Sequence, residues 1–376
     1  MALFVAMERP RILVVGAGLA GLALARSLAA AGWEPEVVDR AGGWDVLGTG
    51  IYLPANGTRA LRALGLEQAA RELGAEIARQ QIRDRRGRVL VDVDLRRFWE
   101  GVGPCLALHR ADLHALLREG VPVRLGTAVA GLGRVNGPVE VRFGDGREAV
   151  YDLVVGADGL RSTVRRLLVD DRPPDPVGQD SWRFVTTSPP GLTTWSVLLD
   201  RRSSFLTIPI GQGRVYCYAD VLTEGGGGGA ARDLGPLPRE RFAGLPAPVP
   251  ELLERAAAEP VHAAPIEQVA AEQWGRGAVV LVGDAAHGMS PNMAQGAALA
   301  FEDALVLTEC LGQAASVPDA LAAFVARRHP RASWVRAQTH RRDHTRRLPP
   351  PVRNPLLRAV GPRIFRANFR PLLAPA

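Results

Sequence analysis

The sequence predicts an α/β protein in which a dinucleotide-binding domain is interrupted by a separate antiparallel sheet. Three observations predict this fold class. A strand, a glycine-rich turn, a helix and a second strand follow one another within residues 11–40. Short alternating strands with many aromatic residues begin near residue 181. An apolar strand at residues 278–282 then resumes the first pattern and ends in Gly283-Asp284.

The first unit carries the features that a bound dinucleotide requires. An apolar strand leads directly into the glycine turn at residues 16–21. We expect Gly16 to allow the tight turn, Gly18 to let the backbone approach a pyrophosphate, and Gly21 to let helix and strand pack closely. The following helix directs free N–H groups and the positive end of its dipole at the phosphates. Asp39, at the tip of the second strand, is placed to accept hydrogen bonds from ribose hydroxyls.

The rest of the first predicted domain, residues 8–180, alternates short helices and strands. Helical spacing of apolar residues predicts helices at 56–64 and 111–118. Alternating residues on either side of Arg86-Gly87 predict a pair of strands. A further apolar strand ends just before Asp158-Gly159. Because the carboxyl ends of parallel strands meet at one sheet edge, we expect this acid to lie near the glycine turn.

The second predicted domain, residues 181–265, is the inserted antiparallel sheet. Its strands are expected at 182–186, 194–199, 205–210 and 215–221. Tyr216 and Tyr218 share one face of their strand, where lining a substrate space and packing in a core are equally good interpretations. Trp182, Trp195 and Phe205 are interpreted as core, and Arg183 and Thr207 are weaker candidates for the site. The glycine run 225–229 and the proline-rich stretch 235–250 are expected to form a flexible loop.

Residues 266–330 return to the first domain, and residues 331–376 form a C-terminal helical tail. A long helix is predicted from Gly296. The arginine-rich segment 327–347 is interpreted as a solvated helix face, with a docking surface for NADPH phosphates as the alternative. Beyond it, Pro355, Pro362 and Pro371 are expected to interrupt any long amphipathic helix.

Composition limits the class of protein. The chain has 376 residues, of which 47% are hydrophobic and 23% charged, as expected for a soluble globular protein. It contains no lysine, so all 46 basic residues are arginine. The net charge is +7, but the arginines are spread out and aromatic residues are only 6%, which argues against nucleic acid as a partner. The sequence has no apolar stretch of the length and composition of a membrane span, so no integral membrane contact is expected. Three widely spaced cysteines predict reduced thiols in the cytoplasm and no metal site.

Three motifs together resemble one enzyme family. They are the glycine turn 16–21, the segment Asp152–Arg165, and GDAAHGMSPNMAQGAALAFEDA at Gly283–Ala304, which is the most specific. The chain resembles the single-component, class A FAD-dependent monooxygenases typified by p-hydroxybenzoate hydroxylase. The resemblance implies a Rossmann-like FAD-binding domain with an inserted antiparallel-sheet substrate domain. It also implies bound FAD, NADPH or NADH as transient reductant, and O2 that forms a flavin C4a-hydroperoxide, which hydroxylates an aromatic or polycyclic small molecule. A monomer or homodimer is expected.

The motifs and the resemblance also imply the site residues. Asp284 is expected to contact the ribityl hydroxyls, Arg110 the flavin chain, and the helix opening at Gly296 the pyrimidine edge of the ring. The aspartate that corresponds to Asp158 contributes indirectly to FAD and nicotinamide binding in relatives. The full set expected to bind FAD is Gly16, Gly18, Leu19, Ala20, Gly21, Asp39, Arg40, Gly50, Arg110, Asp158, Gly283, Asp284, Pro291, Gly296 and Ala297. The residues expected to line the substrate space are Tyr52, Thr207, Tyr216, Tyr218 and Pro291. No catalytic side chain is expected, because the flavin carries the chemistry.

Two departures and several alternatives remain open. Ala294 and Ala298 stand where relatives usually have glycine and asparagine, which bears on the tuning of the ring. A flavin halogenase is disfavoured, because that reaction passes through an active-site lysine and this chain has none. An FAD-dependent epoxidase, a reductase, or a redox-neutral cyclase of an isoprenoid or other secondary metabolite would keep the FAD site. A flavin- or ligand-binding protein without turnover is the alternative from another class.

Overall fold

The computed structural model describes residues 10–44, 48–168, 170–223 and 233–376. Its dinucleotide-binding part is built on a six-stranded sheet in the order β18-β19-β12-β1-β2-β8. The strands from β19 to β8 pair in parallel, and β18 is antiparallel. The strands span β1 Ile12–Val15, β2 Glu36–Val38, β8 Val123–Arg124, β12 Leu153–Gly156, β18 Gly275–Arg276 and β19 Val279–Leu281. The predicted apolar strands at 12–15 and 278–282 are therefore both present, two positions apart in one sheet.

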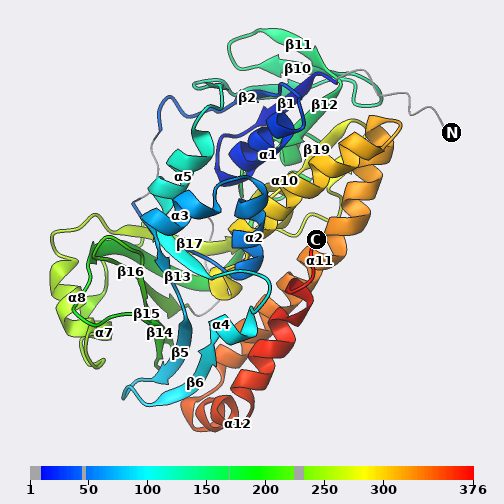
Figure 1. Cartoon of the computed structure of the whole chain (residues 1–376). Coiled ribbons are helices and arrows are strands. Elements are labelled where there is room, and N and C mark those ends of the chain that lie inside the picture. The colour runs from blue at the N-terminus through cyan, green and yellow to red at the C-terminus, as the bar shows by residue number, and fades with distance from the viewer. Residues whose placement is uncertain (1–9, 45–47, 169, 224–232) are drawn as a thin grey trace.

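Helices and small sheets surround this central sheet (Figure 1). α1 packs against the long helix α10, which in turn packs against α2 and α11. The helices near the sheet are α1 Leu19–Ala30, α2 Ala55–Ala63, α3 Glu67–Leu73, α5 Arg110–Arg118, α6 Thr163–Leu168, α9 Asp284–His287 and α10 Gly296–Gln313. Two three-stranded sheets complete this part, one of β3 Gly50–Leu53, β7 Leu106–His109 and β4 Ala75–Glu76, the other of β9 Val129–Leu132, β10 Val139–Phe143 and β11 Glu148–Tyr151.

The second large sheet has seven strands in the order β17-β13-β16-β15-β14-β5-β6. All four predicted strands belong to it, as β13 Asp175–Thr187, β14 Trp195–Leu199, β15 Ser203–Pro209 and β16 Arg214–Leu222. β17 His262–Gln268 forms one edge. At the other edge, β5 Arg79–Asp84 pairs in parallel with β14, and β6 Val89–Asp94 follows it. The sheet therefore draws strands from both sides of the predicted boundary at residue 181.

A separate core covers the outer face of this second sheet. Trp182, Phe184 and Phe205 are buried there against α7 Arg239–Phe242 and α8 Val249–Arg255. The expectation of a flexible loop over 235–250 was wrong, because Phe242, Leu245 and Val249 provide enough apolar surface to fold the segment onto the sheet. The glycine run 225–229 lies outside the described residues.

The C-terminal helices correct a second expectation. α11 Val317–Arg347 is continuous through Pro330, and α12 Pro350–Phe369 contains both Pro355 and Pro362. A proline inside a helix costs about 3 kcal/mol, because it removes a backbone donor and crowds the preceding turn. Packing of α12 offsets this cost, since burying each of Leu357, Phe365 and Phe369 contributes about 1.5–3 kcal/mol. The prolines therefore did not interrupt the helix.

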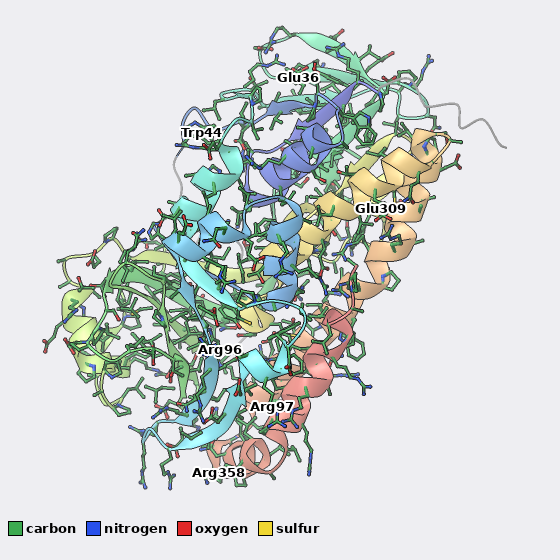
Figure 2. All side chains as sticks on the ribbon, viewed as in Figure 1. Glu36, Trp44, Arg96, Arg97, Glu309 and Arg358 are labelled. Carbon is green, nitrogen blue, oxygen red and sulfur yellow. The ribbon has the colours of Figure 1, made fainter. Side chains whose placement is uncertain are left out.

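α12 lies beside β6 at the end of the molecule remote from the six-stranded sheet (Figure 1). Gly361 makes the approach possible, because a Cβ at this position would lie 2.4 Å from Cγ2 of Val91. Nearby, Arg358 extends from the helix (Figure 2) and pairs with Asp84 at the end of β5, with 3.6 Å between Nη2 and Oδ2.

Among the helices of the described residues, none combines the length and the apolar character that a membrane-spanning segment needs.

Candidate active site

The glycine turn has the geometry that its three glycines predict. Gly16 has a φ of +108°, and its N–H donates to the carbonyl oxygen of Val38 at 2.7 Å. A Cβ on Gly16 would lie 2.5 Å from the carbonyl oxygen of Ala157, and one on Gly21 only 1.9 Å from the carbonyl oxygen of Gly16. A Cβ on Gly18 would meet nothing within 4 Å. Gly16 and Gly21 are therefore fixed by packing, whereas the side of Gly18 is open.

The predicted acid lies directly against this turn. Asp39 accepts a hydrogen bond from the N–H of Ala17 at 2.7 Å through Oδ2, and one from the N–H of Ala41 at 2.8 Å through Oδ1. It is half-buried, whereas Arg40 is exposed. Neither residue is among those that line the cavity described next. The structure therefore places Asp39 beside the turn and leaves Arg40 outside the cavity lining.

One cavity of about 750 Å³ connects the two large sheets. Its first end is lined by the start of α1, by the start of α10 and by two charged side chains. These residues are Gly18, Leu19, Ala20, Arg110, Asp284, Gly296 and Ala297. The opposite wall is the inner face of the seven-stranded sheet.

Helix ends and charges at the first end fit FAD. α1 and α10 both begin without a side-chain cap, so free N–H groups and two positive dipole ends face the cavity. Such helix starts suit a pyrophosphate and the negative edge of a reduced flavin ring. Asp284 is exposed toward the cavity and Arg110 lies near it. Burial lowers the pKa of the Arg110 guanidinium, and the Asp284 carboxylate opposes that shift. Together these groups match the phosphates, hydroxyls and ring of the cofactor.

Two residues predicted to bind FAD are not part of the cavity lining. Asp158 accepts hydrogen bonds from the N–H groups of Thr163 at 2.6 Å and Val164 at 3.2 Å, which fixes the start of α6. Gly283 has a φ of +58°, and a Cβ there would lie 2.8 Å from Cβ of Ala20. Asp158 therefore fixes the start of α6, and Gly283 allows its strand end to approach α1 closely.

A buried ion network below α10 holds this end of the site in place. The guanidinium of Arg328 donates to Asp303 at 2.8 Å and to Glu302 at 2.9 Å. Arg331 also donates to Glu302, at 2.7 and 2.8 Å. Asp303 in turn accepts from the N–H of Gly283 at 2.9 Å and lies 2.7 Å from Nε2 of His287. Burial alone would raise the pKa of Asp303, but His287 and Arg328 lower it to about 2.

The network corrects the expectation of a solvated arginine face on α11. The side chain of Arg328 is 0% exposed and that of Arg331 is 11% exposed. Sequence reasoning missed the network, although a signal was present. Glu302 and Asp303 stand side by side within the apolar helix Gly296–Gln313, and a charge on such a helix requires a buried partner.

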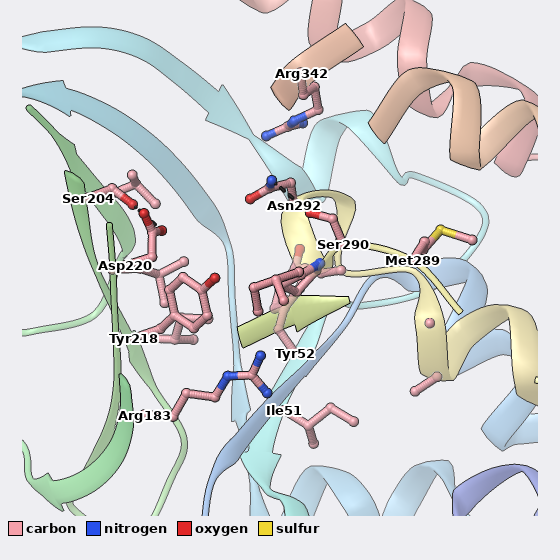
Figure 3. A pocket seen from close by; sticks show the side chains of 18 of the residues that line it. Ile51, Tyr52, Arg183, Ser204, Tyr218, Asp220, Met289, Ser290, Asn292 and Arg342 are labelled. Carbon is pink, nitrogen blue, oxygen red and sulfur yellow. Dashed lines mark hydrogen bonds between the residues drawn. The ribbon is translucent and has the colours of Figure 1, made fainter. Parts of the chain in front are cut away.

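The second end of the cavity has an aromatic wall. Tyr52, Trp195, Tyr216 and Tyr218 all line it, and the ring centroids of Tyr52 and Trp195 are 6.4 Å apart. Figure 3 shows Arg183 and Tyr218 projecting from the sheet toward Tyr52. The guanidinium of Arg183 lies 5.4 Å from the ring centre of Tyr218. Burial raises the pKa of Tyr218 to about 12, so its hydroxyl stays protonated at neutral pH.

Further polar side chains in this wall were not predicted from the sequence. Ser204 donates to Asp220 at 2.7 Å, and Arg346 of α11 pairs with the same carboxylate. Arg342 and Asn292 also line the cavity (Figure 3). They come from distant segments, so no local pattern indicated that they meet.

Strand alternation corrects one predicted substrate residue. Ser204, Leu206 and Ile208 of β15 line the cavity, whereas Phe205 belongs to the outer core. Thr207 falls on the face of Phe205 and is not among the lining residues, so its assignment to the substrate space was wrong. Successive side chains alternate between the two faces of the sheet, and the sequence did not reveal which face met the cavity.

Close packing explains the residue types at two further positions, Gly50 and Ala298. Gly50 lines the cavity, but a Cβ there would lie 2.3 Å from Cβ of Tyr216, so this glycine also lets β3 approach β16. Ala298 is fully buried, and its Cβ lies 3.0 Å from where a Cβ on Gly57 would be. Ala298 therefore packs against α2.

Backbone conformation explains the other unusual alanine. Ala294 has φ of 51° and ψ of 36°, the left-handed conformation that glycine adopts most easily. This accounts for the glycine that the family resemblance leads one to expect there. Pro291, which lines the cavity, begins the 3₁₀ turn Pro291–Met293 that ends at Ala294.

Asp343 is a half-buried residue beside this turn. It accepts a hydrogen bond from Nδ2 of Asn292, but its Oδ2 is buried with no partner among the described residues. Burial raises the pKa of Asp343 from 3.8 to about 6. Below about pH 4 the carboxyl is protonated in both the folded and the unfolded chain. Between about pH 4 and 6 only the unfolded chain ionises, so folding becomes less favourable as pH rises.

We therefore predict that Asp343→Asn stabilises the protein at pH 7 by on the order of 2 kcal/mol. The gain should shrink as pH falls and disappear below about pH 4. Urea unfolding of both proteins across pH 3.5–8 measures it. A gain of the same size at every pH would contradict the prediction, because it would show an effect unrelated to ionisation.

Among the described residues, no three His, Cys, Asp or Glu side chains gather closely enough to hold a metal ion.

Comparison with known proteins identifies several relatives. A family model described as FAD binding domain matches residues 9–339. The chain is 36% identical over 341 residues to an aurachin C monooxygenase/isomerase of Stigmatella aurantiaca, covering 88% of each chain. It is 32% identical to a 6-hydroxynicotinate 3-monooxygenase of Pseudomonas fluorescens, covering 89% of this chain and 91% of that one. The structure of a single-residue variant of Klebsiella pneumoniae HpxO complexed with FAD has the same fold, with a TM-score of 0.81, 24% identity and coverage of 97% and 96%.

Proposed function

We propose a substrate class on one premise: the chain belongs to the class A FAD-dependent monooxygenases, with FAD as cofactor and NAD(P)H and O2 as co-substrates. The substrate is an aromatic or polycyclic small molecule, which the enzyme hydroxylates. One O2, one NAD(P)H and one proton are consumed per substrate, and the products are the hydroxylated ring, water and NAD(P)⁺. When bound, FAD supplies hydride acceptance and oxygen activation.

The observation that carries the proposal is the continuity of one cavity. The same space is lined by the starts of α1 and α10 and by the aromatic wall of the second sheet. A substrate against Tyr52, Trp195 and Tyr216 therefore shares one space with the predicted flavin residues. Cofactor and substrate together would exclude water from this space, which would limit side reactions of the activated oxygen with water.

We propose individual tasks for the lining residues. The N–H groups at Leu19 and Ala20 would hold the pyrophosphate, and Asp284 and Arg110 the ribityl chain and its phosphate. The α10 start at Gly296 and Ala297 would stabilise negative charge at the pyrimidine edge of the ring, by about 0.3–2 kcal/mol for a helix terminus. The remaining predicted FAD residues would support these contacts.

Donors on the sheet would orient the substrate. Nε of Arg183 is buried and finds no hydrogen-bond partner among the described residues, and Arg183 lines the cavity. The protonated hydroxyl of Tyr218 lies beside it. A hydroxyl or keto oxygen on the substrate ring would accept hydrogen bonds from Arg183 and Tyr218. The aromatic wall would pack against the faces of the ring. Hydroxylated aromatic and heteroaromatic rings fit this combination.

We also propose the organisation of the chain around this site. Residues 8–180 without β5 and β6, together with 266–330, form the cofactor domain. Residues 181–265 with β5 and β6 form the substrate domain, and residues 331–376 the helical tail. The thiols of Cys105, Cys217 and Cys310 are free and buried, which favours the cytoplasm as the location. A monomer or homodimer is proposed.

Isotope labelling tests the reaction. The purified FAD-loaded protein is mixed with NADPH or NADH and a panel of phenols, hydroxypyridines and hydroxyquinolines under ¹⁸O2. We expect substrate-stimulated NAD(P)H oxidation and a product heavier by one ¹⁸O atom. A redox-neutral cyclase would change the substrate without ¹⁸O, and a reductase would consume NAD(P)H without ¹⁸O in the product. Either result, or no turnover with any ring class, would reject the proposal.

A further inference from the structure

We infer that the cavity continues into an apolar arm that holds an aliphatic chain attached to the aromatic ring of the substrate. The inference rests on the proposed function, since it concerns the same substrate. The arm is defined by nine lining residues on β5, β6, β14, β15 and α12. They are Ile82, Val91, Val93, Val197, Leu199, Leu206, Leu357, Ile364 and Phe365.

The inner face of the seven-stranded sheet changes character across its width. At the β13 and β16 side the lining residues are polar or aromatic, namely Arg183, Tyr216, Tyr218 and Asp220. Toward the other edge, alternate residues of β14, β5 and β6 line the cavity, namely Trp195, Val197, Leu199, Gln80, Ile82, Val91 and Val93, and most of these side chains are aliphatic. A ligand along this face therefore meets donors at one end and hydrocarbon at the other.

Helix α12 forms the opposite wall of the arm. Leu357 and Phe365 are 9% and 6% exposed and line the cavity beside the sheet edge. The helix can lie this close to β6 because Gly361 has no Cβ to collide with Val91. This wall is formed by the tail that was expected to be broken by prolines. The helix therefore gives the C-terminal segment a task in substrate selection.

Polar side chains in the arm are few and partly occupied. Gln80, Arg353 and Asn368 are those lining the cavity on β5 and α12. Nη1 of Arg353 donates to the carbonyl oxygens of Asp200 at 2.9 Å and Arg346 at 3.3 Å, whereas its Nη2 is buried with no partner among the described residues. A second ring with several polar substituents would lose hydration here and gain few matching partners. An alkyl or prenyl chain loses no hydrogen bonds on entry.

A homologous series of probes tests the arm by binding alone. The FAD-loaded protein is titrated with para-alkylphenols from methyl to nonyl, with the flavin absorbance change as the signal. Each methylene that enters the arm should tighten binding about fourfold, which corresponds to about 0.8 kcal/mol, until the arm is filled. A dissociation constant that does not change with chain length would overturn the inference.

Two adjacent leucines on α12 provide a matched pair of variants. Leu357→Trp fills the arm and should flatten the dependence of affinity on chain length. Leu356→Trp, whose side chain lies on the exposed face at 39%, should leave that dependence as in the parent protein. Val197→Phe, on the opposite wall, repeats the test if the helix variant folds poorly. An unchanged dependence in both Leu357→Trp and Val197→Phe would show that the chains bind elsewhere and would overturn the inference.

The readouts separate this inference from the proposed function. A dependence on chain length that Leu357→Trp abolishes supports the arm even if no probe is hydroxylated. Hydroxylation of ring compounds without any gain from the chain supports the function and overturns the arm.

Discussion

Replacing Arg328 by methionine lowers the free energy of unfolding by about 3–5 kcal/mol, the cost typical of removing one partner from a buried ion pair. The methionine side chain is long and flexible enough to occupy much of the same space. It leaves the carboxylates of Asp303 and Glu302, which are 0% and 4% exposed, without their shared cation. Arg331 still reaches Glu302, but among the described residues Asp303 keeps only His287 and the N–H of Gly283 as partners.

The neighbouring arginine is the control. Arg327 is 36% exposed and pairs at 3.0 Å with Glu309, which is 46% exposed, so Arg327→Met should cost about 1 kcal/mol or less. Urea unfolding of the FAD-free proteins measures both changes. Similar losses in the two variants would show that the buried network contributes no more than a surface pair. FAD binding should also weaken in Arg328→Met, because Asp303 holds the strand end at Gly283.

Local patterns were sufficient for much of the fold. The glycine turn and the βαβ unit follow from glycine spacing and apolar runs, which depend on neighbours in the sequence alone. Three of the four predicted strands of the second sheet match within two residues, because alternation is a property of each strand, whereas β13 begins at Asp175, well before the predicted start at residue 182. Gly16 has the positive φ of the tight turn expected of it, and Gly21 the close packing, since both roles arise within one supersecondary unit.

Tertiary packing decided what the sequence left open. Whether Thr207 or Leu206 faced the cavity depended on which side of the sheet met the cofactor domain. Whether Pro355 and Pro362 ended a helix depended on the burial of apolar side chains of α12, which packs beside β6. Whether Arg328 was solvated depended on acids 25 residues away or more. These questions require contacts between distant segments, which short-range periodicity does not contain.

Alanine at two glycines of the same turn should separate folding from cofactor binding. At Gly21, the new Cβ would lie 1.9 Å from the carbonyl oxygen of Gly16, so α1 must move away from the turn. Overpacking of this kind costs about 1–3 kcal/mol, and the displaced helix start should weaken FAD binding on the order of 100-fold, about 2.7 kcal/mol. Both the stability of the FAD-free protein and its flavin content should fall.

At Gly18 the same methyl group meets no protein atom within 4 Å, so the FAD-free protein should lose about 1 kcal/mol at most, the cost of alanine at a helix N-cap. The methyl group instead enters the space in which the pyrophosphate backbone must approach α1, and FAD affinity should fall about tenfold or more, at least about 1.4 kcal/mol. Flavin fluorescence titration and thermal unfolding of the FAD-free proteins give the two quantities independently. Full FAD affinity in Gly18→Ala would show that the open side of the turn does not face the cofactor, and the assignment of this end of the cavity to FAD phosphates would then be wrong. Equal loss of stability in the two variants would instead show that Gly18, like Gly21, is required by packing.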